Sequence, residues 1–455
     1  MKVAFYTLGC KVNQYETQGL REAFLRAGYT VADEREPADV YVVNTCTVTG
    51  MSDRKSRQYI RRTKRLNPQS VTVVTGCYAQ TGARQVAAIP GVDIVAGTNE
   101  KANILRYVEE YLAARRTVSE TASKAQDEAA PVCHIRPYEE LDQYEEMGII
   151  TSMESRTRAF IKIQEGCNRF CSYCVIPYAR GTLRSRNKAE IVAEARSLLT
   201  KGFKELVLTG INTALYGMEP DFLTEEGEPR GVESIVKAIS ALPGEFRIRL
   251  SSLEPTVVNA EYVLRLLQYE KLCHHLHLSL QSGSDPVLCA MNRHYTAAEY
   301  EKIVAELRKI DPGYGISTDL IAGFPGETED DHRQTLAVIS RSMFCKVHAF
   351  PYSKRKGTKA AALPEQISPE IKARRSAELA AAGELAADAF FRSCAGQIRT
   401  VLFEEKDEKT GLWRGHADNF VQVYCHSEND LENQFVQVQL CEPLAEGIRG
   451  ELCGR

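Results

Sequence analysis

The chain has 455 residues, of which 44% are hydrophobic and 26% are charged, and its net charge is -3. This length predicts about two to four globular domains, and the near balance of charge excludes a uniformly basic nucleic-acid coat protein. No apolar run approaches the ~20 residues of a membrane helix, and the start "MKVAFYTLG" has no signal-peptide core. We therefore expect a cytoplasmic protein with no membrane partner, in which the fourteen cysteines serve metal binding or catalysis, or are buried, rather than form disulfides.

Residues 1–113 alternate short β-branched runs with helical stretches. Strands are expected at "KVAFYT", "DVYVVN", "SVTVVTG" and "VDIVAG", and helices over "ETQGLREAFLRAG" and "RKSRQYIRRTKRL". This alternation predicts an α/β domain with a parallel sheet flanked by helices. The pattern is lost over residues 114–157, which include "TVSETASKAQDEAAP" and are expected to form a linker or an embellishment.

Residues 158–393 restart the alternation with six strand-like runs. These are "AFIKIQ", "ELVLTG", "FRIRLSS", "HLHLSLQS", "GISTDLIAG" and "CKVHAF", with helical stretches such as "KAEIVAEARSLLTKG" and "TAAEYEKIVAELRKI" between them. Six successive βα units predict a partial (β/α)6 barrel. An Ala-rich helix from "SPEIKARR" onward closes this region.

Residues 394–455 change to short runs that alternate apolar and polar residues. The runs "IRTVLFEE", "LWRGHADNFVQVYC" and "NQFVQVQLC" are separated by turn-like spacers. This pattern predicts a small C-terminal β-barrel.

Three cysteines of the first region each follow a predicted strand: Cys10 in "YTLGC", Cys46 in "VVNTC" and Cys77 in "VVTGC". Because the carboxyl ends of parallel strands converge on one crevice, these cysteines are expected to meet at a ligand site. The alternative is that each fills space in the core, as buried cysteines often do.

A second set, Cys167, Cys171 and Cys174, lies in "EGCNRFCSYCVIP" directly after the first strand of the predicted barrel. No other Cys or His lies within 30 residues on either side, whereas a structural zinc site needs four protein ligands. Three thiolates can hold three irons of a [4Fe–4S] cluster and leave the fourth iron free for a small molecule. The other eight cysteines show no ligand spacing and are interpreted as buried or incidental.

The spacing C-x3-C-x2-C, with Tyr173 before the last cysteine, resembles the signature of the radical S-adenosylmethionine superfamily. In that superfamily the open iron binds S-adenosylmethionine, whose reductive cleavage gives a 5′-deoxyadenosyl radical. The flanking segments "TLGCKVNQYET", "VVNTC", "TGCYAQ" and "QEGCNRFCSYCVIPYARGTLRSR" together resemble the methylthiotransferases within it. This resemblance covers nearly the whole chain.

The resemblance implies two [4Fe–4S] clusters, an auxiliary one on Cys10, Cys46 and Cys77 and a radical one on Cys167, Cys171 and Cys174. It also implies that the last region is a TRAM domain, a small RNA-binding β-barrel. The clusters would act together to insert a methylthio group into a C–H bond of the substrate, and no catalytic side chain beyond the ligands is singled out. Candidate contacts to S-adenosylmethionine are Tyr173 and polar residues after the barrel strands, namely Thr209, Gly210, Asn212, Ser251, Glu254, Gln281 and Ser282.

The opening "GCKVNQYET" resembles the branch, of MtaB type in bacteria, that modifies threonylcarbamoyladenosine at position 37 of tRNA. The expected partners are then a tRNA anticodon stem-loop and a reductant protein such as a flavodoxin or ferredoxin. Two alternatives within the family are isopentenyladenosine in tRNA and an aspartate of a ribosomal protein. An alternative of another class is an iron–sulfur protein that binds RNA or carries electrons without radical chemistry.

Basic clusters give separate support for an RNA partner. The segment "RKSRQYIRRTKR" includes Arg57, Arg61 and Arg62, and "YSKRKGTK" includes Lys354 and Arg355. Such clusters neutralise phosphates, although a solvated basic helix face gives the same pattern. Trp413 and Phe420 of the last region are candidates for stacking on unpaired bases, with a place in the barrel core as the alternative.

Overall fold

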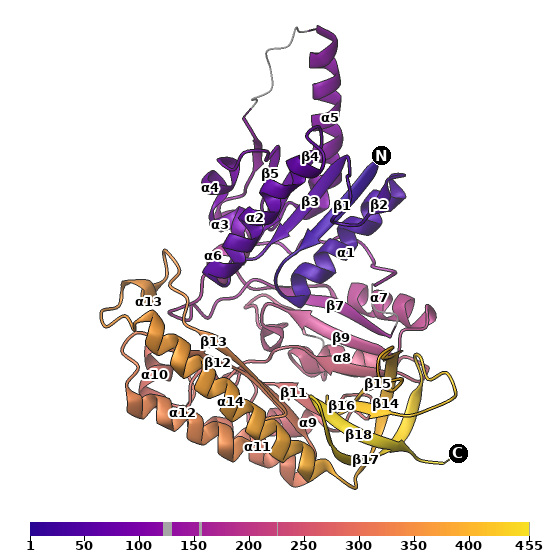
Figure 1. Cartoon of the computed structure of the whole chain (residues 1–455), viewed down its shortest axis with the longest axis vertical. Helices are drawn as coiled ribbons and strands as arrows, with labels where there is room; N and C mark the ends of the chain where they lie inside the picture. The colour runs from indigo at the N-terminus through magenta and orange to yellow at the C-terminus, as the bar shows by residue number, and fades with distance from the viewer. Residues whose placement is uncertain (122–129, 154–156, 225, 455) are drawn as a thin grey trace.

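The computed structural model describes residues 1–121, 130–153, 157–224 and 226–454. In Figure 1 the N-terminal sheet lies at the top, a curved set of parallel strands lies below it, and a small barrel formed by the C-terminal strands lies at the lower right. This order of domains matches the expected fold class.

The N-terminal domain is a parallel sheet of six strands in the order β2-β1-β3-β4-β5-β6. Every residue of the central strands β3 and β4 is buried, as expected when helices cover both faces of a parallel sheet. The strands are β1 (Lys2–Thr7), β2 (Thr30–Ala32), β3 (Val40–Thr45), β4 (Val71–Gly76), β5 (Ile94–Ala96) and β6 (Val132–His134). The helices are α1 (Lys11–Arg26), α2 (Gly50–Leu66), α3 (Cys77–Thr81), α4 (Ala83–Ala87), η1 (Lys101–Asn103) and α5 (Ile104–Thr121).

The segment 114–157, expected as a linker or an embellishment, contains ordered structure that belongs to the sheet. Helix α5 continues through Ala113, and β6 pairs with β5 at the edge of the sheet. A short helical turn, η2 (Tyr138–Glu140), follows, and Leu141 and Ile150 are buried. Residues 122–129 and 154–156 of this segment lie outside the described residues.

The central domain confirms the partial barrel of six βα units. The six parallel strands are β7 (Arg158–Glu165), β9 (Glu205–Gly210), β10 (Arg247–Leu250), β11 (His275–His277), β12 (Gly315–Ala322) and β13 (Lys346–Pro351). A short strand, β8 (Arg184–Ser185), pairs antiparallel with β7, and the parallel bridges Ile248–Leu272 and Leu253–Leu278 join β10 to the β11 segment.

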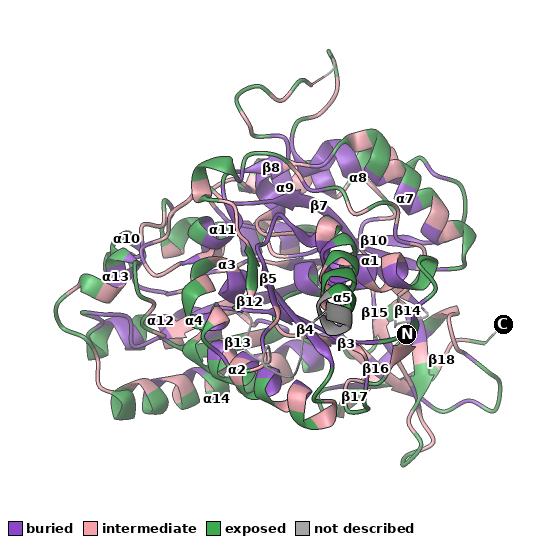
Figure 2. Ribbon diagram, turned by 90° about the horizontal axis from the view of Figure 1, so that it is seen from above, coloured by how far each residue is buried: buried purple, intermediate pink, exposed green. Residues whose placement is uncertain are grey.

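Helices on the outer face of these strands bury the main apolar core, and Figure 2 shows buried strands surrounded by helices with exposed outer faces. The expected helices α11 and α12 each begin with a capping box, at Thr296 and Thr328. The helices of the domain are α6 (Ile176–Arg180), α7 (Lys188–Thr200), η3 (Thr213–Leu215), α8 (Val232–Ser240), α9 (Ala260–Leu266), α10 (Asp285–Ala290), α11 (Ala297–Ile310), α12 (Glu329–Ser342), α13 (Lys359–Ala362) and α14 (Pro369–Cys394).

The C-terminal strands form a closed barrel in the order β14-β15-β16-β18-β17, which confirms the expected small β-barrel. Arg249 anchors it to the central domain by donating to the backbone oxygen of Asp418, and Arg399 pairs with Asp311 at 2.6 Å. The strands are β14 (Ile398–Lys406), β15 (Trp413–Ala417), β16 (Gln422–Cys425), β17 (Phe435–Leu444) and β18 (Gly447–Leu452). No helix among the described residues is long and apolar enough to cross a lipid bilayer.

Candidate functional site

Cys10, Cys46 and Cys77 lie at the carboxyl ends of three neighbouring strands. Cys46 follows β3, Cys77 follows β4, and Cys10 immediately precedes α1 in the loop after β1. Burial raises the pKa of Cys46 to about 11, and the nearby Cys77 and Cys10 thiols add to this shift. The structure therefore brings the first cysteine set together at one edge of the N-terminal sheet.

Two glycines allow these three loops to approach one another closely. Gly9 has a positive φ of 112°, and a Cβ atom there would lie 3.1 Å from Cys46 Sγ. Gly76, with φ of 93°, packs so tightly that a Cβ would lie 2.4 Å from the Thr45 carbonyl oxygen. Glycine is required at such positions because a side chain would be both strained and in collision.

The second cysteine set occupies the loop after β7, at the carboxyl edge of the barrel. The Cys167 amide donates to the Gly181 carbonyl at 3.1 Å, and the Ser172 amide donates to Met291 at 3.0 Å, so the loop is held from two sides. Burial raises the pKa of Cys167 to about 11 and that of Cys174 to about 12. Metal binding at this loop must therefore displace thiol protons, which favours loading at higher pH.

Two arginines that were not singled out from the sequence reach the cysteine sulfurs with side chains that are at most 7% exposed. Arg180 Nε donates to Cys77 Sγ at 3.2 Å, and Arg293 Nη1 donates to Cys171 Sγ at 3.4 Å. Arg180 falls within the quoted segment "VIPYARGT", whereas no spacing in the sequence marks Arg293. Each arginine places a positive charge and an N–H donor beside a potential metal ligand.

The spacing of the sulfurs tests which metal group the cysteines fit. Among the described residues, the single group of three Cys, His, Asp or Glu side chains whose ligand atoms all lie within 4.8 Å of one another is His277, Asp319 and His348. Neither cysteine set is so compact, whereas tetrahedral zinc with Zn–S bonds of ~2.3 Å brings its ligands closer than this. Three thiols that do not all lie within 4.8 Å of one another, with a cationic donor beside one of them, fit an iron–sulfur cluster, in which each sulfur binds a different iron.

The candidate cofactor residues gather at the same edge of the barrel as the second cysteine set. The Asn212 side chain donates to Glu254 at 2.7 Å, while its Oδ1 atom is buried and has no partner among the described residues. Glu254 also accepts from Arg169 of the cysteine loop at 3.1 Å. Gln281 has a positive φ of 67°, a strained conformation typical of binding sites.

The remaining candidate contacts to S-adenosylmethionine differ in how far they are buried. Tyr173 packs against an apolar cluster that includes Phe324 and Tyr352. Ser282 is buried, and its hydroxyl accepts from the Ser284 amide at 3.2 Å, so it serves the loop itself. Gly210 ends β9, and Thr209 and Ser251 are buried at the ends of their strands.

The inner face of strands β11 to β13 is polar. Leu276 and Leu320 point into the core beneath the outer helices, so the alternating positions face the barrel interior. There His277 Nε2 lies 3.1 Å from Asp319 Oδ2, and His348 stands opposite Asp319 in the strand register. Histidine and carboxylate groups therefore line the interior on this side.

Comparisons with known proteins assign the family. Residues 2–97 match the uncharacterized protein family UPF0004, and residues 161–339 match the Radical SAM superfamily. The chain is 39% identical over 442 residues to threonylcarbamoyladenosine tRNA methylthiotransferase MtaB of Bacillus subtilis (strain 168), covering 96% of this chain and 93% of that protein. The chain belongs to the radical-SAM methylthiotransferase family. Membership implies a [4Fe–4S] cluster and S-adenosylmethionine as cofactors.

Other relatives of this methylthiotransferase include both tRNA branches. The MtaB protein of Aquifex aeolicus (strain VF5) is 38% identical, covering 89% of this chain and 93% of that protein. A tRNA-2-methylthio-N(6)-dimethylallyladenosine synthase of Caldicellulosiruptor saccharolyticus is 33% identical, covering 98% and 91%. Among solved structures, the radical S-adenosylmethionine methyltransferase TsrM from Kitasatospora setae, with cobalamin and a [4Fe-4S] cluster bound, has a TM-score of 0.57 at 16% identity, covering 79% of this chain and 76% of that one. That likeness shows a shared fold.

The structure of the methylthiotransferase narrows the candidate RNA contacts. Trp413 is 8% exposed and packs in the core of the C-terminal barrel. Phe420 is stacked on His275 and His416, with ring centroids 4.5 and 5.1 Å away. Trp413 therefore fits the alternative of a place in the barrel core, whereas Phe420 is half-buried and stays a prediction as a stacking residue.

The basic residues predicted to contact RNA differ in their exposure and in whether their charge is already paired. Arg355 pairs with Asp53 at 2.6 Å and joins the central domain to the N-terminal domain, so its charge is already compensated. Arg57 is half-buried and donates to the Tyr78 hydroxyl at 3.1 Å, and Arg62 is half-buried. Arg61 and Lys354 are exposed and remain available for phosphates.

Proposed function

We propose that this methylthiotransferase adds a methylthio group to carbon 2 of N6-threonylcarbamoyladenosine at position 37 of tRNA. The relatives named for this substrate reach 39% and 38% identity, compared with 33% for the dimethylallyladenosine synthase, and the chain spans more than 90% of the length of all three. This order of similarity favours the threonylcarbamoyl branch.

The observation that carries the proposal is the link that Arg180 and Gly181 make between the two cysteine sets across the domain interface. Arg180 donates to Cys77 of the first set, and the neighbouring Gly181 carbonyl accepts from Cys167 of the second. Two reactive centres held at a fixed relative position can deliver a radical and a sulfur to the same carbon, because the reacting groups are oriented in advance.

We assign a [4Fe–4S] cluster to each set, the auxiliary one to Cys10, Cys46 and Cys77 and the radical one to Cys167, Cys171 and Cys174. With S-adenosylmethionine bound, these groups supply a 5′-deoxyadenosyl radical and the sulfur to be transferred. The protein holds the ligands, orients cofactor and substrate, and excludes water. Asn212, Glu254 and Gln281 are the rim residues best placed to bind S-adenosylmethionine.

The polar interior of the barrel supports the choice of substrate. A threonylcarbamoyl group carries a carboxylate, a hydroxyl and urea N–H groups, whereas an isopentenyl group is apolar. Asp319 and His348 can pair with such groups, and the Lys11 ammonium faces this space without an ion-pair partner among the described residues. An apolar substituent would offer no partner to His348 or to the Lys11 ammonium, and covering such groups without a partner costs free energy.

The proposed partners follow from the substrate and the cofactor. We assign the anticodon stem-loop to the surface that carries Arg61 and Lys354, where exposed cations can neutralise phosphates. We interpret the C-terminal barrel as a TRAM domain, which would add further RNA contacts. A flavodoxin or ferredoxin would supply the electron for cleavage of S-adenosylmethionine.

The proposal is tested with reconstituted protein under anaerobic conditions, with S-adenosylmethionine, sulfide and dithionite. The substrates are synthetic anticodon stem-loops that carry threonylcarbamoyladenosine, isopentenyladenosine or adenosine at position 37. We expect 5′-deoxyadenosine in all reactions and a methylthio product only with threonylcarbamoyladenosine. A product only with isopentenyladenosine would overturn the assignment of the substrate. Absence of 5′-deoxyadenosine with fully loaded protein would overturn the assignment of radical chemistry.

A further inference from the structure

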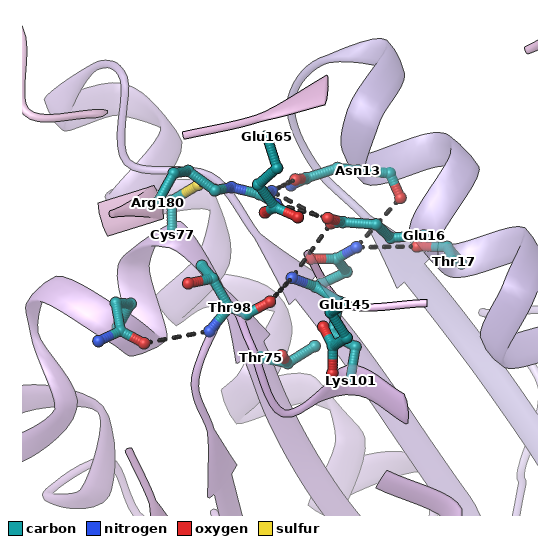
Figure 3. Close-up of polar contacts among 12 residues, drawn as sticks. Asn13, Glu16, Thr17, Thr75, Cys77, Thr98, Lys101, Glu145, Glu165 and Arg180 are labelled. Atoms are coloured by element: carbon teal, nitrogen blue, oxygen red, sulfur yellow. Dashed lines mark hydrogen bonds and ion pairs between the residues drawn. The ribbon is translucent and has the colours of Figure 1, made fainter. Parts of the chain in front are cut away.

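Arg180 reaches from the central domain into the N-terminal domain and contacts side chains of both (Figure 3). It is the last residue of α6, and its side chain is fully buried. Nε donates to Cys77 Sγ at 3.2 Å. Nη1 donates to Glu16 at 2.5 Å and to Glu165 at 2.7 Å, and Nη2 donates to Asn13 at 2.6 Å and to Glu16 at 3.1 Å. These contacts use all five N–H donors of the guanidinium group.

The main chain around Arg180 is held just as firmly. The Ala179 carbonyl accepts from Thr98 Oγ1 of the N-terminal domain at 2.7 Å, and the Gly181 carbonyl accepts from the Cys167 amide at 3.1 Å. One short segment therefore fixes a cysteine of the radical set through its backbone and a cysteine of the auxiliary set through its side chain.

The charges around Arg180 leave a place for an anion. Glu16 and Glu165 each bridge several of the surrounding cations, and Glu145 lies beside Lys101. The four buried cations are Arg180, Arg184, Lys101 and Lys162, and the three buried carboxyl groups are Glu16, Glu165 and Glu145. A buried cation in excess is costly unless an anion lies near it. The sulfur of Cys77 is the acceptor in contact with Arg180, and a metal-bound cysteine sulfur is a thiolate.

We propose that Arg180 is a positioning residue that sets the place and the reduction potential of the auxiliary cluster through Cys77. This inference rests on the proposed assignment of Cys10, Cys46 and Cys77 as ligands of that cluster. An N–H donor and a positive charge at a ligand sulfur favour the more negative, reduced form of a cluster. Arg180 therefore raises the reduction potential of the auxiliary cluster. It also couples the position of this cluster to the loop that carries Cys167, Cys171 and Cys174.

The test uses the full chain in a background with Cys167→Ala, Cys171→Ala and Cys174→Ala, in which only the auxiliary cluster can form. Arg180→Gln and Arg180→Lys are compared with Arg186→Gln. Arg186 is an equally buried arginine of the same segment that pairs with Glu194 at 2.7 Å and contacts no cysteine among the described residues. The measurements are iron content, circular dichroism, and the fraction of reduced cluster by electron paramagnetic resonance at controlled potentials.

We expect Arg180→Gln to lower the ratio of reduced to oxidised cluster about tenfold at a fixed potential, which is ~59 mV for a one-electron couple. Arg180→Lys keeps the positive charge but not the planar set of N–H donors, so its shift should be smaller than that of Arg180→Gln. Arg186→Gln should leave the ratio of reduced to oxidised cluster unchanged. Loss of the cluster in folded Arg180 variants alone would also support the positioning role.

Three results would overturn the inference. An unchanged ratio in folded, fully loaded Arg180 variants would show that the contact with Cys77 has no effect on the cluster. An equal shift in Arg186→Gln, or equal loss of folded protein in the Arg180 and Arg186 variants, would assign Arg180 a purely structural role. If the background protein holds no cluster while retaining its fold, the ligand assignment under the proposed function fails, and this inference fails with it.

Discussion

At the scale of single residues, arginine connects the cysteine sets to the rest of the molecule. Arg180 and Arg293 each give one N–H donor to a cysteine sulfur, and Arg293 also lies 3.6 Å from Glu254 at the barrel rim. Arginine suits this task because it stays charged when buried and offers five donors in a fixed plane. Neither residue could be assigned from the sequence, since local patterns do not reveal that a charged side chain will be buried in a network.

Glu145 provides a prediction at the same scale. Burial raises the pKa of its carboxyl group from 4.5 to about 7, more than nearby Lys101 lowers it. Its contribution to stability is therefore present below pH 4.5 and is lost as the pH rises through about 7. At about 1.4 kcal/mol per pH unit, the ionised form costs about 3 kcal/mol at most. Glu145→Gln keeps the acceptor for the Ala102 amide, so we expect it to stabilise the apoprotein by about 1–3 kcal/mol at pH 8.

Urea unfolding at pH 5 and pH 8 measures this effect. At pH 5 the gain should be small, because the wild-type carboxyl group is mostly protonated there. Glu140→Gln, at an exposed position of the same segment, serves as the control and should change neither value. An equal gain from Glu145→Gln at both pH values would contradict the account.

At the scale of elements, the ends of parallel strands position both cysteine sets. Because β1, β3 and β4 are neighbours in the sheet, cysteines far apart in the sequence come together, and this could be anticipated from the strand pattern alone. Other elements could not be anticipated from the sequence pattern. Strand β18 includes Gly447 and Gly450, although glycine is typical of turns. A Cβ at Gly450 would lie 2.3 Å from Val438, so close packing of the strands requires glycine there. Helix α8 begins at Val232, and the preceding Gly231 provides no side-chain cap.

The roles proposed for the two cysteine sets lead to a prediction for the loops that carry them. Changing Cys10, Cys46 and Cys77 together to Ala should lower the iron content from about eight to about four per chain, since each cluster holds four irons. Formation of 5′-deoxyadenosine should continue, while the methylthio product should fall at least about a hundredfold, because the sulfur donor is lost but the radical source remains.

The control for this variant is a chain with Cys133, Cys289 and Cys441 changed to Ala. These cysteines are exposed or half-buried and should leave both the iron content and the product unchanged. Loss of 5′-deoxyadenosine formation in the Cys10, Cys46 and Cys77 variant, with the radical loop still loaded, would contradict the division of roles.

At the scale of the whole molecule, the N-terminal and C-terminal domains both pack against the central domain. Helix α1 of the N-terminal domain packs against the central domain, where Glu16 pairs with Lys162 and Tyr15 donates to Glu194 at 3.0 Å. On the other side, Phe420 of the C-terminal barrel stacks on His275 at the base of the central domain. The order and class of the domains could be predicted from the periodicity of apolar residues in the sequence. These interfaces could not be predicted, because they depend on side chains that meet only in the folded chain.

The most direct test of the account is nucleoside mass spectrometry of tRNA from a host that lacks its own methylthiotransferases but makes both precursor adenosines. We predict that expression of this chain yields 2-methylthio-threonylcarbamoyladenosine, and that the Cys10, Cys46 and Cys77 variant does not. The isopentenyl counterpart alone would contradict the assigned substrate. If neither nucleoside forms although the protein cleaves S-adenosylmethionine, the tRNA assignment is wrong, and the ribosomal protein becomes the substrate to examine.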